Sequence, residues 1–364
     1  MHIRPYVRSD LEAFWRFWDT EFGEKPAELR VKEFLQVLEG NPYSKKKNDY
    51  WVLEESGKTV AYCGLMPYEY YIRGKRHNIF IYHDSMVDPK RRRQGLGYEL
   101  VKRMTAKIQE PSIAVWMNLP NSRLFDKCGW VSVRDMRARL LIYDSTPFWR
   151  DRVHSAARVG PGGLNAVLSI IRKVMELRRT KVGQGVYRVE EIDVFDGRVE
   201  MLFEQEKSKY KYIGCRDQKT LNWKYAYMKP PHFVKLICLE RETVKGYVVF
   251  YISELGRGIR KGSVVDFLCA DMDPSIFENL IEGAVRQLKE EKVAYIEILS
   301  SNGSYNKLLK GFGFVRGMDM KHALKVMHFD ALEPLEFLCA GENWFFTYGD
   351  GDRIFWNSNS PQGR

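Results

Sequence analysis

The chain of 364 residues carries 58 Lys and Arg against 47 Asp and Glu, which gives a formal net charge of +11 and a pI near 9.2. This length suits about two domains. No apolar run approaches the roughly 20 residues that a membrane-spanning helix needs, and charged residues interrupt the first 12 positions where a signal peptide would lie. The composition therefore predicts a cytoplasmic protein without a membrane span.

The basic excess suggests an anionic ligand, and a nucleic acid is one class to weigh. The densest cationic clusters are short, however, and no recognition-helix, RNP or zinc-finger pattern occurs. A polyanionic small molecule explains the charge about as well, so nucleic-acid binding is disfavoured. The six cysteines are far apart and lack the paired spacing of metal ligands, which predicts reduced core residues and no metal site.

The first 80 residues read as alternating strands and turns after one helix. A short strand at residues 3–5 precedes a helix that begins near Asp10. Strands at 50–54 and 59–65 flank Ser56-Gly57, and a second hairpin turns at Arg73-Gly74 before a strand at 79–87. These elements predict an antiparallel sheet.

The segment that follows this sheet predicts an anion-binding turn. Asp88-Pro89 ends the strand, Gly95 and Gly97 permit a close turn, and a helix begins near Leu96. Successive backbone N–H groups and the helix dipole then point to one place. Four consecutive cations at 90–93 flank the turn, so the expected ligand carries several phosphates.

The turn lacks the Gly-Lys-Ser/Thr of a Walker loop, and Leu100 stands where a dinucleotide fingerprint needs its third glycine. The remaining pattern, Arg92-x-x-Gly95-x-Gly97, resembles the Arg/Gln-x-x-Gly-x-Gly/Ala signature of the GCN5-related N-acetyltransferases (GNAT). Residues 118–130, reading NLPNSRLFDKCGW, resemble that family's Asn…Leu-Tyr-x-x-x-Gly-Phe segment. The resemblance covers residues 1 to about 145.

The resemblance implies a coenzyme A-binding domain at residues 1–148 and an enzyme that transfers an acyl group from acetyl-CoA or another short acyl-CoA to an amine, without a metal. It also implies the residues that hold the coenzyme, which are Met86, Val87, Arg92, Arg93, Gln94, Gly95, Leu96, Gly97, Tyr98, Asn118 and Phe125.

Catalysis needs a polarised thioester carbonyl, a neutral amine and a proton for the departing thiolate. Backbone N–H groups around Met86 and Val87 are the expected carbonyl donors. Side chains at 81, 83, 85 and 87 should share one strand face, which makes His83 a candidate base and Ser85 an acceptor contact. Asp84 should face the other way, as a second catalytic or a structural carboxylate. A merely packed histidine explains His83 equally well.

The proton donor is the open question in this mechanism. Phe125 stands where the family often has a tyrosine, so the usual hydroxyl is missing. Either another group replaces it, or the thiolate leaves stabilised by the helix end and water.

Residues 149–186 read as a basic linker that contains an amphipathic helix at 164–177. A membrane-surface helix would show this pattern, but a helix that packs on a domain is the favoured interpretation.

The organisation of the first half recurs at 187–330, which predicts two copies of one domain. The fold class is therefore α+β, with two tandem GNAT-like domains, each a central mixed, mostly antiparallel sheet flanked by helices. After the strand at 263–269 the second copy reads Ala-Asp-Met-Asp-Pro, without the glycine turn and with two acids that repel phosphate. We expect it to have lost coenzyme binding and to form the acceptor side, with residues 331–364 as an extension.

The acceptor is not specified by any one motif. Trp223, Tyr225 and Asp266 are the candidate acceptor contacts, and the tandem layout looks similar to bacterial acyltransferases that modify nucleotide-linked amino sugars. Other small amines, polyamines, aminoglycosides and peptide amines are alternatives. A non-catalytic module that senses acyl-CoA or binds through its basic surface is the alternative from another class, and the sequence leaves a homo-oligomer open.

Overall fold

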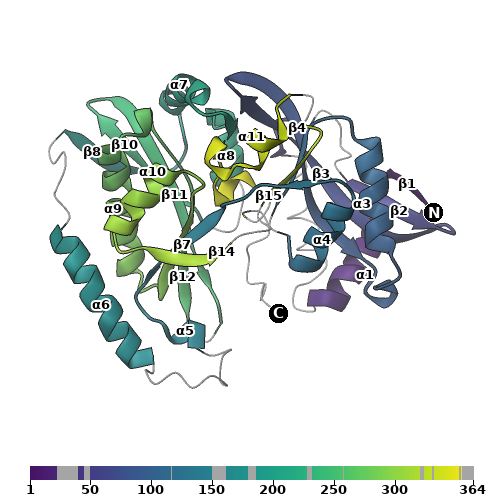
Figure 1. Ribbon diagram of the computed structural model, residues 1–364, viewed down its shortest axis with the longest axis horizontal. Coiled ribbons are helices and arrows are strands. Elements are labelled where there is room, and N and C mark those ends of the chain that lie inside the picture. Colours follow the sequence, from purple (N-terminus) through teal and green to yellow (C-terminus); the bar gives the residue numbers. More distant parts are fainter. Residues whose placement is uncertain are drawn as a thin grey trace.

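The computed structural model describes residues 1–22, 40–44, 50–115, 117–149, 161–178, 186–227, 232–256, 258–319, 324–329, 332–351 and 354. Two mixed sheets flanked by helices make up the molecule. The first sheet lies on the right in Figure 1 and the second sheet on the left. This confirms the predicted fold class.

The first sheet runs in the order β1, β2, β3, β4, β5, β15, β6, and β9 and β16 extend it beside β3. β4 and β5 are parallel, whereas β1 to β4 pair antiparallel. Ser56, Gly57, Arg73 and Gly74 all have positive φ, so both hairpin turns form where they were predicted. The strands are β1 His2–Pro5, β2 Tyr50–Glu55, β3 Lys58–Ile72, β4 Lys75–Val87, β5 Ser112–Val115, β6 Val131–Ser132, β9 Tyr212–Gly214, β15 Leu324–Met327 and β16 Trp344–Phe345.

The second sheet runs in the order β14, β7, β13, β12, β11, β10, β8. β12 and β13 are parallel and the other neighbours are antiparallel, which repeats the pattern of the first sheet. The strands are β7 Arg137–Ile142, β8 Tyr187–Ile192, β10 Val234–Glu240, β11 Thr243–Glu254, β12 Arg260–Cys269, β13 Tyr295–Leu299 and β14 Val315–Asp319.

Each sheet contains an interior strand from the other half of the chain, in addition to β9 and β16, which the second half adds beside β3. β7 precedes the linker in sequence, yet it lies between β13 and β14 of the second sheet. β15 comes from the second half and lies between β5 and β6 of the first sheet. The sheets therefore do not follow the expected chain boundaries at 148 and 187, because each takes an interior strand from the other half.

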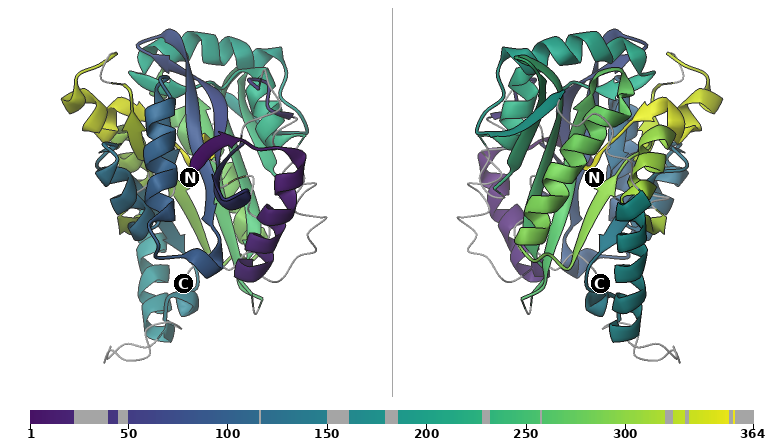
Figure 2. Two further views of the ribbon diagram at one scale, coloured as in Figure 1. Left: turned by 90° about the vertical axis from the view of Figure 1, so that its right-hand side faces the viewer. Right: turned by 90° about the vertical axis from the view of Figure 1, so that its left-hand side faces the viewer.

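Helices cover both sheets. α3 and α4 pack on the first sheet, and α7 and α9 pack on the second. α9 and α6 lie on the outer side of the second half (Figure 2). The helices are α1 Leu11–Phe22, α3 Leu96–Lys107, α4 Leu119–Lys127, α5 Thr146–Trp149, α6 Pro161–Arg178, α7 Gly197–Glu206, α8 Gln218–Tyr225, α9 Pro274–Glu290, α10 Gly303–Gly311 and α11 Leu335–Cys339.

The linker helix α6 packs on the segment that follows β7, beside the second sheet, but not through its apolar face. Asn165 donates to Asp144 at 3.0 Å and accepts from the backbone of Ser145 at 2.7 Å, and the Arg172 guanidinium lies over the Tyr143 ring. Val167, Ile170, Ile171 and Val174 remain exposed. Among the described residues no helix is long and apolar enough to cross a membrane.

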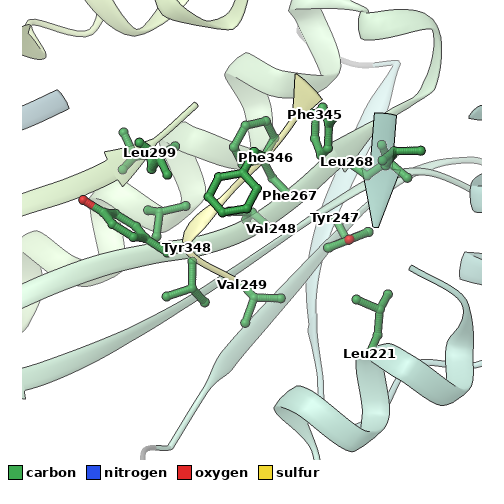
Figure 3. Close-up of a cluster of buried hydrophobic side chains, with 14 of the residues drawn as sticks. Leu221, Tyr247, Val248, Val249, Phe267, Leu268, Leu299, Phe345, Phe346 and Tyr348 are labelled. Atoms are coloured by element: carbon green, nitrogen blue, oxygen red, sulfur yellow. The ribbon is translucent and has the colours of Figure 1, made fainter. Parts of the chain in front are cut away.

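The segment after α11 packs into the molecule. Trp344, Phe345, Phe346 and Tyr348 are buried, and Figure 3 shows the last three beside Phe267, Val249 and Leu299 of the second half. One core cluster continues from Met66 in the first sheet to this segment and the second sheet. The predicted extension at 331–364 is thus, where the structure describes it, part of the core.

We predict that neither half folds alone. Residues 1–155 would lack β15 between β5 and β6, and β7 would have no sheet to join, so burial of both strand edges would be lost. Expressed separately, 1–155 and 156–364 should show no cooperative thermal transition, whereas co-expressed fragments should copurify and melt together. A cooperative transition for 1–155 alone would show that the exchange is dispensable.

Candidate functional site

A cleft of about 720 Å³ opens where β4 ends and α3 begins. It brings together nearly all of the residues expected to hold a coenzyme. Its walls come from the end of β4, the turn into α3 and the start of α4. The predicted residues that line it are Ser85, Met86, Val87, Arg92, Arg93, Gly95, Leu96, Gly97, Tyr98, Asn118 and Phe125. Gln94 lies in the same turn but does not line the cleft, and its side chain accepts from Arg91 instead.

The N-terminus of α3 faces this cleft without a side-chain cap. Gly95 is the N-cap residue with φ of 80°, a left-handed conformation that glycine adopts without strain. No side chain accepts from the first-turn N–H groups, which therefore remain available to an anion. A Cβ at Gly97 would lie 3.2 Å from the Leu124 side chain, so this glycine lets α3 approach α4.

The floor of the cleft forms where β4 and β5 diverge. The last pair between these parallel strands is Tyr82 with Ala114. β4 continues to Val87, and beyond Tyr82 no described strand pairs with the edge that faced β5. Backbone groups along this edge are therefore accessible to a ligand, as expected for Met86 and Val87.

A β-bulge in β4 changes which side chains share a face. The register shifts between Tyr62 paired with Met86 and Gly64 paired with His83, and Asp84 has a φ of 41°. Val87 returns to the face that packs on α3, whereas His83 points to the opposite face. The expectation that positions 81, 83, 85 and 87 share one face is wrong, because the extra residue breaks the alternation.

His83 is a packed residue in this structure. Its ring lies edge-on to Tyr50 with centroids 5.2 Å apart, and a Cβ at Gly64 would lie 2.2 Å from Nε2. His83 is 4% exposed, and burial lowers its pKa to about 3. A group with so low a pKa is a weak base at neutral pH. Asp84 accepts from the Tyr50 hydroxyl at 3.0 Å, which favours the structural role over the catalytic one.

Tyr82 is a cleft residue that the sequence analysis did not identify. Its ring lies edge-on to Phe125 with centroids 4.9 Å apart, and both residues line the cleft. Burial raises the pKa of Tyr82 well above its ordinary value. Its hydroxyl is buried and makes no hydrogen bond of ordinary geometry among the described residues, although the side chains of Cys63 and Ser85 lie close enough to shift its pKa. Alternation along β4 could not predict this residue, because the contact between Tyr82 and Phe125 joins segments that are distant in the sequence.

In the second half, the place equivalent to the coenzyme-type cleft is filled in two ways. α9 follows β12 as α3 follows β4, but the Asp273 side chain accepts from the Ser275 N–H and caps the helix itself. β12 and β13 also diverge, after Val264 and Ile298. There the segment 344–350 fills the gap: Phe346 N–H donates to Ser301 at 3.1 Å and Thr347 donates to Asp266 at 3.2 Å.

The expected acceptor residues lie inside the second half. Asp266 accepts from Arg216 at 3.1 Å and from the Tyr225 hydroxyl at 3.0 Å, and Arg216 also donates to Asp350 at 2.6 Å. Trp223 is 3% exposed and packs near Gly40. Of the four expected acceptor residues, only Ser85 lines the cleft, and Trp223, Tyr225 and Asp266 do not. This buried charge network holds the segment 344–350 on β12.

The fold and cleft define a protein of two GNAT-like units with one open coenzyme-type cleft. Residues 2–132 match the family model described as an acetyltransferase (GNAT) domain, and the match ends at β6. This part of the chain is therefore similar to a GNAT acetyltransferase domain. No curated protein matches the sequence.

Solved structures of three proteins resemble nearly the whole chain. A GCN5-related N-acetyltransferase from Anabaena variabilis ATCC 29413 is 11% identical with a TM-score of 0.60, over 89% of this chain and 72% of that one. Saccharomyces cerevisiae N-myristoyltransferase with bound myristoyl-CoA is 14% identical with a TM-score of 0.55, over 89% and 81%. A GCN5-related N-acetyltransferase from Kribbella flavida is 12% identical with a TM-score of 0.57, over 93% and 73%. At these identities the likeness establishes the fold.

We predict that His83 weakens the fold in acid. Its folded pKa of about 3 lies below the ordinary value of about 6.5, so the unfolded chain binds the proton first as pH falls. The contribution to stability is complete above pH 6.5 and falls by about 2 kcal/mol by pH 5.

Urea unfolding of His83→Gln at both pH values tests this expectation. The variant should lose less stability than the wild type between neutral pH and about pH 5, while His232→Gln, which changes an exposed histidine, should behave as the wild type. Equal losses in His83→Gln and the wild type would contradict the burial argument.

Proposed function

We propose that the protein is a coenzyme A-dependent N-acyltransferase, which moves an acetyl or other short acyl group from acyl-CoA to a primary amine. The observation that carries this proposal is the cleft in which the uncapped N-terminus of α3 meets the open edge of β4. One end of this cleft suits a phosphate group, and the other offers unpaired strand backbone to a thioester carbonyl.

The turn between β4 and α3 would hold the coenzyme. N–H groups of Leu96, Gly97 and Tyr98 belong to the first helical turn and suit the pyrophosphate. Arg92 and Arg93 line the same cleft and add positive charge. Phe125 and Val87 offer apolar contacts toward the thioester end. The residues present therefore fit an acyl-CoA.

Tyr82 is our candidate for the proton donor that Phe125 cannot supply. During transfer the amine nitrogen bonds to the thioester carbon, the carbon–sulfur bond breaks, and the thiolate needs a proton. The Tyr82 phenol stays protonated at neutral pH because burial raises its pKa. Tyr82 lines the cleft beside Phe125, and Ser85, another cleft residue, lies near its buried hydroxyl. The phenolate would regain the proton that the amine releases.

A nucleotide-linked amino sugar is the acceptor class that we favour. The net charge of +11 suits a substrate with phosphate groups and disfavours polycationic acceptors such as polyamines and aminoglycosides. Other small amines and peptide amines are the alternative acceptors. An acyl-CoA sensor without turnover is the competing function, since it needs the same turn but no proton donor.

We predict that a negative charge at Gly95 abolishes coenzyme binding. Asp and Asn both tolerate the left-handed conformation, and a Cβ at Gly95 meets no atom within 4 Å, so Gly95→Asp and Gly95→Asn differ mainly in charge. Calorimetry with CoA should show at least a tenfold weaker dissociation constant for Gly95→Asp than for Gly95→Asn.

The same variants separate an enzyme from a sensor. Wild-type protein should release free thiol from acetyl-CoA only when an acceptor amine is present, and Gly95→Asp should not. Equal CoA affinity in the two variants would show that the turn between β4 and α3 does not hold the coenzyme. Binding of CoA without turnover for any amine would favour the sensor.

We predict that Tyr82→Phe lowers kcat by roughly 10²-fold or more and leaves the CoA dissociation constant nearly unchanged, because only the hydroxyl is removed. The matched test is Tyr82→Phe combined with Phe125→Tyr, which returns a hydroxyl to the neighbouring ring. Partial recovery of kcat is expected in the double variant. A wild-type kcat in Tyr82→Phe would exclude the phenol as donor.

A further inference from the structure

A second cleft, of about 570 Å³, lies where the exchanged strand β7 meets α10. It shares no residue with the coenzyme-type cleft. Both halves of the chain contribute to it, since β7 comes from the first half and α10 from the second. Its cationic residues are Arg134, Arg137, Arg139, Lys307 and Lys310, and its carboxylates are Asp135, Glu336 and Glu342.

Arg139 forms the floor of this cleft and is only 8% exposed. Its Nε donates to Asn306 Oδ1 at 2.6 Å. The Asn306 amide is itself oriented, because its Nδ2 donates to the Ser300 carbonyl at 3.0 Å. The described residues offer no partner to the two Nη atoms of Arg139, so the outer edge of its guanidinium is available to a ligand.

Comparison with Arg216, another strongly buried arginine, shows that Arg139 lacks a carboxylate partner in the described part of the chain. Arg216 is 1% exposed and pairs with the carboxylates of Asp266 and Asp350. Among the described residues Arg139 has no carboxylate within 4 Å. A buried charge without a counter-charge is costly, and a bound anion would relieve that cost.

The surroundings of Arg139 add positive charge. Burial lowers the pKa of Arg139, and Arg137 and Arg316 lower it further. Asp135 pairs with Arg137 at 3.2 Å, and Glu336 and Glu342 are exposed residues of the wall. Lys307 and Lys310 lie one helical turn apart on α10 and are exposed beside the cleft. The field at the floor is therefore positive.

We propose that this cleft binds the phosphate groups of a small molecule, with the Arg139 guanidinium at its floor and Lys307 and Lys310 on its wall. The planar edge of an arginine donates to two phosphate oxygens at once, and lysines add charge from flexible stems. The cleft volume leaves room for a diphosphate. This site goes beyond the proposed function, since acyl transfer at the other cleft does not require it.

The test is calorimetric titration of full-length protein with inorganic pyrophosphate, with the protein first saturated with CoA. Wild-type protein should bind, and Lys307→Glu with Lys310→Glu should weaken binding at least tenfold. The matched control is Arg286→Glu with Lys289→Glu, two exposed cations at the same spacing on α9 that do not line the cleft. This control should bind as the wild type does.

Arg139→Met tests the floor, and Arg139→Lys keeps the charge without the planar edge. Loss of binding in the first and weaker binding in the second are expected. If Arg139→Met does not fold, the α10 pair still decides the proposal, because both of its positions are exposed. No binding by the wild type, or equal weakening in the α9 control, would overturn it, and tighter binding of citrate would overturn the assignment to phosphate.

The outcome is independent of the proposed function. Pyrophosphate binding that depends on Lys307 and Lys310 can be measured whether or not acetyl-CoA is turned over. If acetyl-CoA is turned over and pyrophosphate competes with the amine, the second cleft binds the phosphate groups of the acceptor. Absence of competition assigns the phosphate to a separate ligand of the same site.

Discussion

Strand exchange between the halves is the constraint on which the rest of the structure depends. β15 closes the first sheet between β5 and β6, and β7 closes the second between β13 and β14. Neither sheet can bury its interior backbone without the other half. The exchange also fixes the distance between the coenzyme-type cleft and the second half, because β6 and β7 are joined by only four residues, 133–136. The exchange thus gives the second half a structural role in the first sheet.

The two halves differ at two equivalent places: the N-terminus of the helix after the diverging strand, and the gap between the diverging strands. At the helix after the diverging strand, Gly95 leaves α3 uncapped, whereas Asp273 caps α9 with its own carboxylate. Between the diverging strands, the first copy has an open cleft and the second holds the segment 344–350. That segment is anchored by Arg216 through Asp350 and Asp266. Its neighbour β16 pairs with β9, which pairs with β3, so the segment that closes one cleft also joins the sheets.

Local features could be predicted from the sequence, and pairings between distant segments could not. The Gly95 turn and the hairpins at Ser56-Gly57 and Arg73-Gly74 depend on a few neighbouring residues, and the structure has them where they were expected. β7 and β15 are short apolar strands whose patterns suit either sheet, so nothing local identifies their partners. The apolar face of α6 has the periodicity of a packed face, yet Asn165 and Arg172 determine how the helix docks.

In the proposed reaction, the bulge at Asp84 limits how an acceptor amine can approach the cleft. One face of β4 is filled by Tyr82, Val87 and the α3–α4 core, and the other is filled where His83 packs on Gly64 and Tyr50. An amine therefore has no route through either face. Ser85, next to the bulge, is exposed and lines the cleft at the end of the strand. In the proposed reaction the amine approaches along this end of β4, on the side where Ser85 and the Tyr82 hydroxyl lie close together.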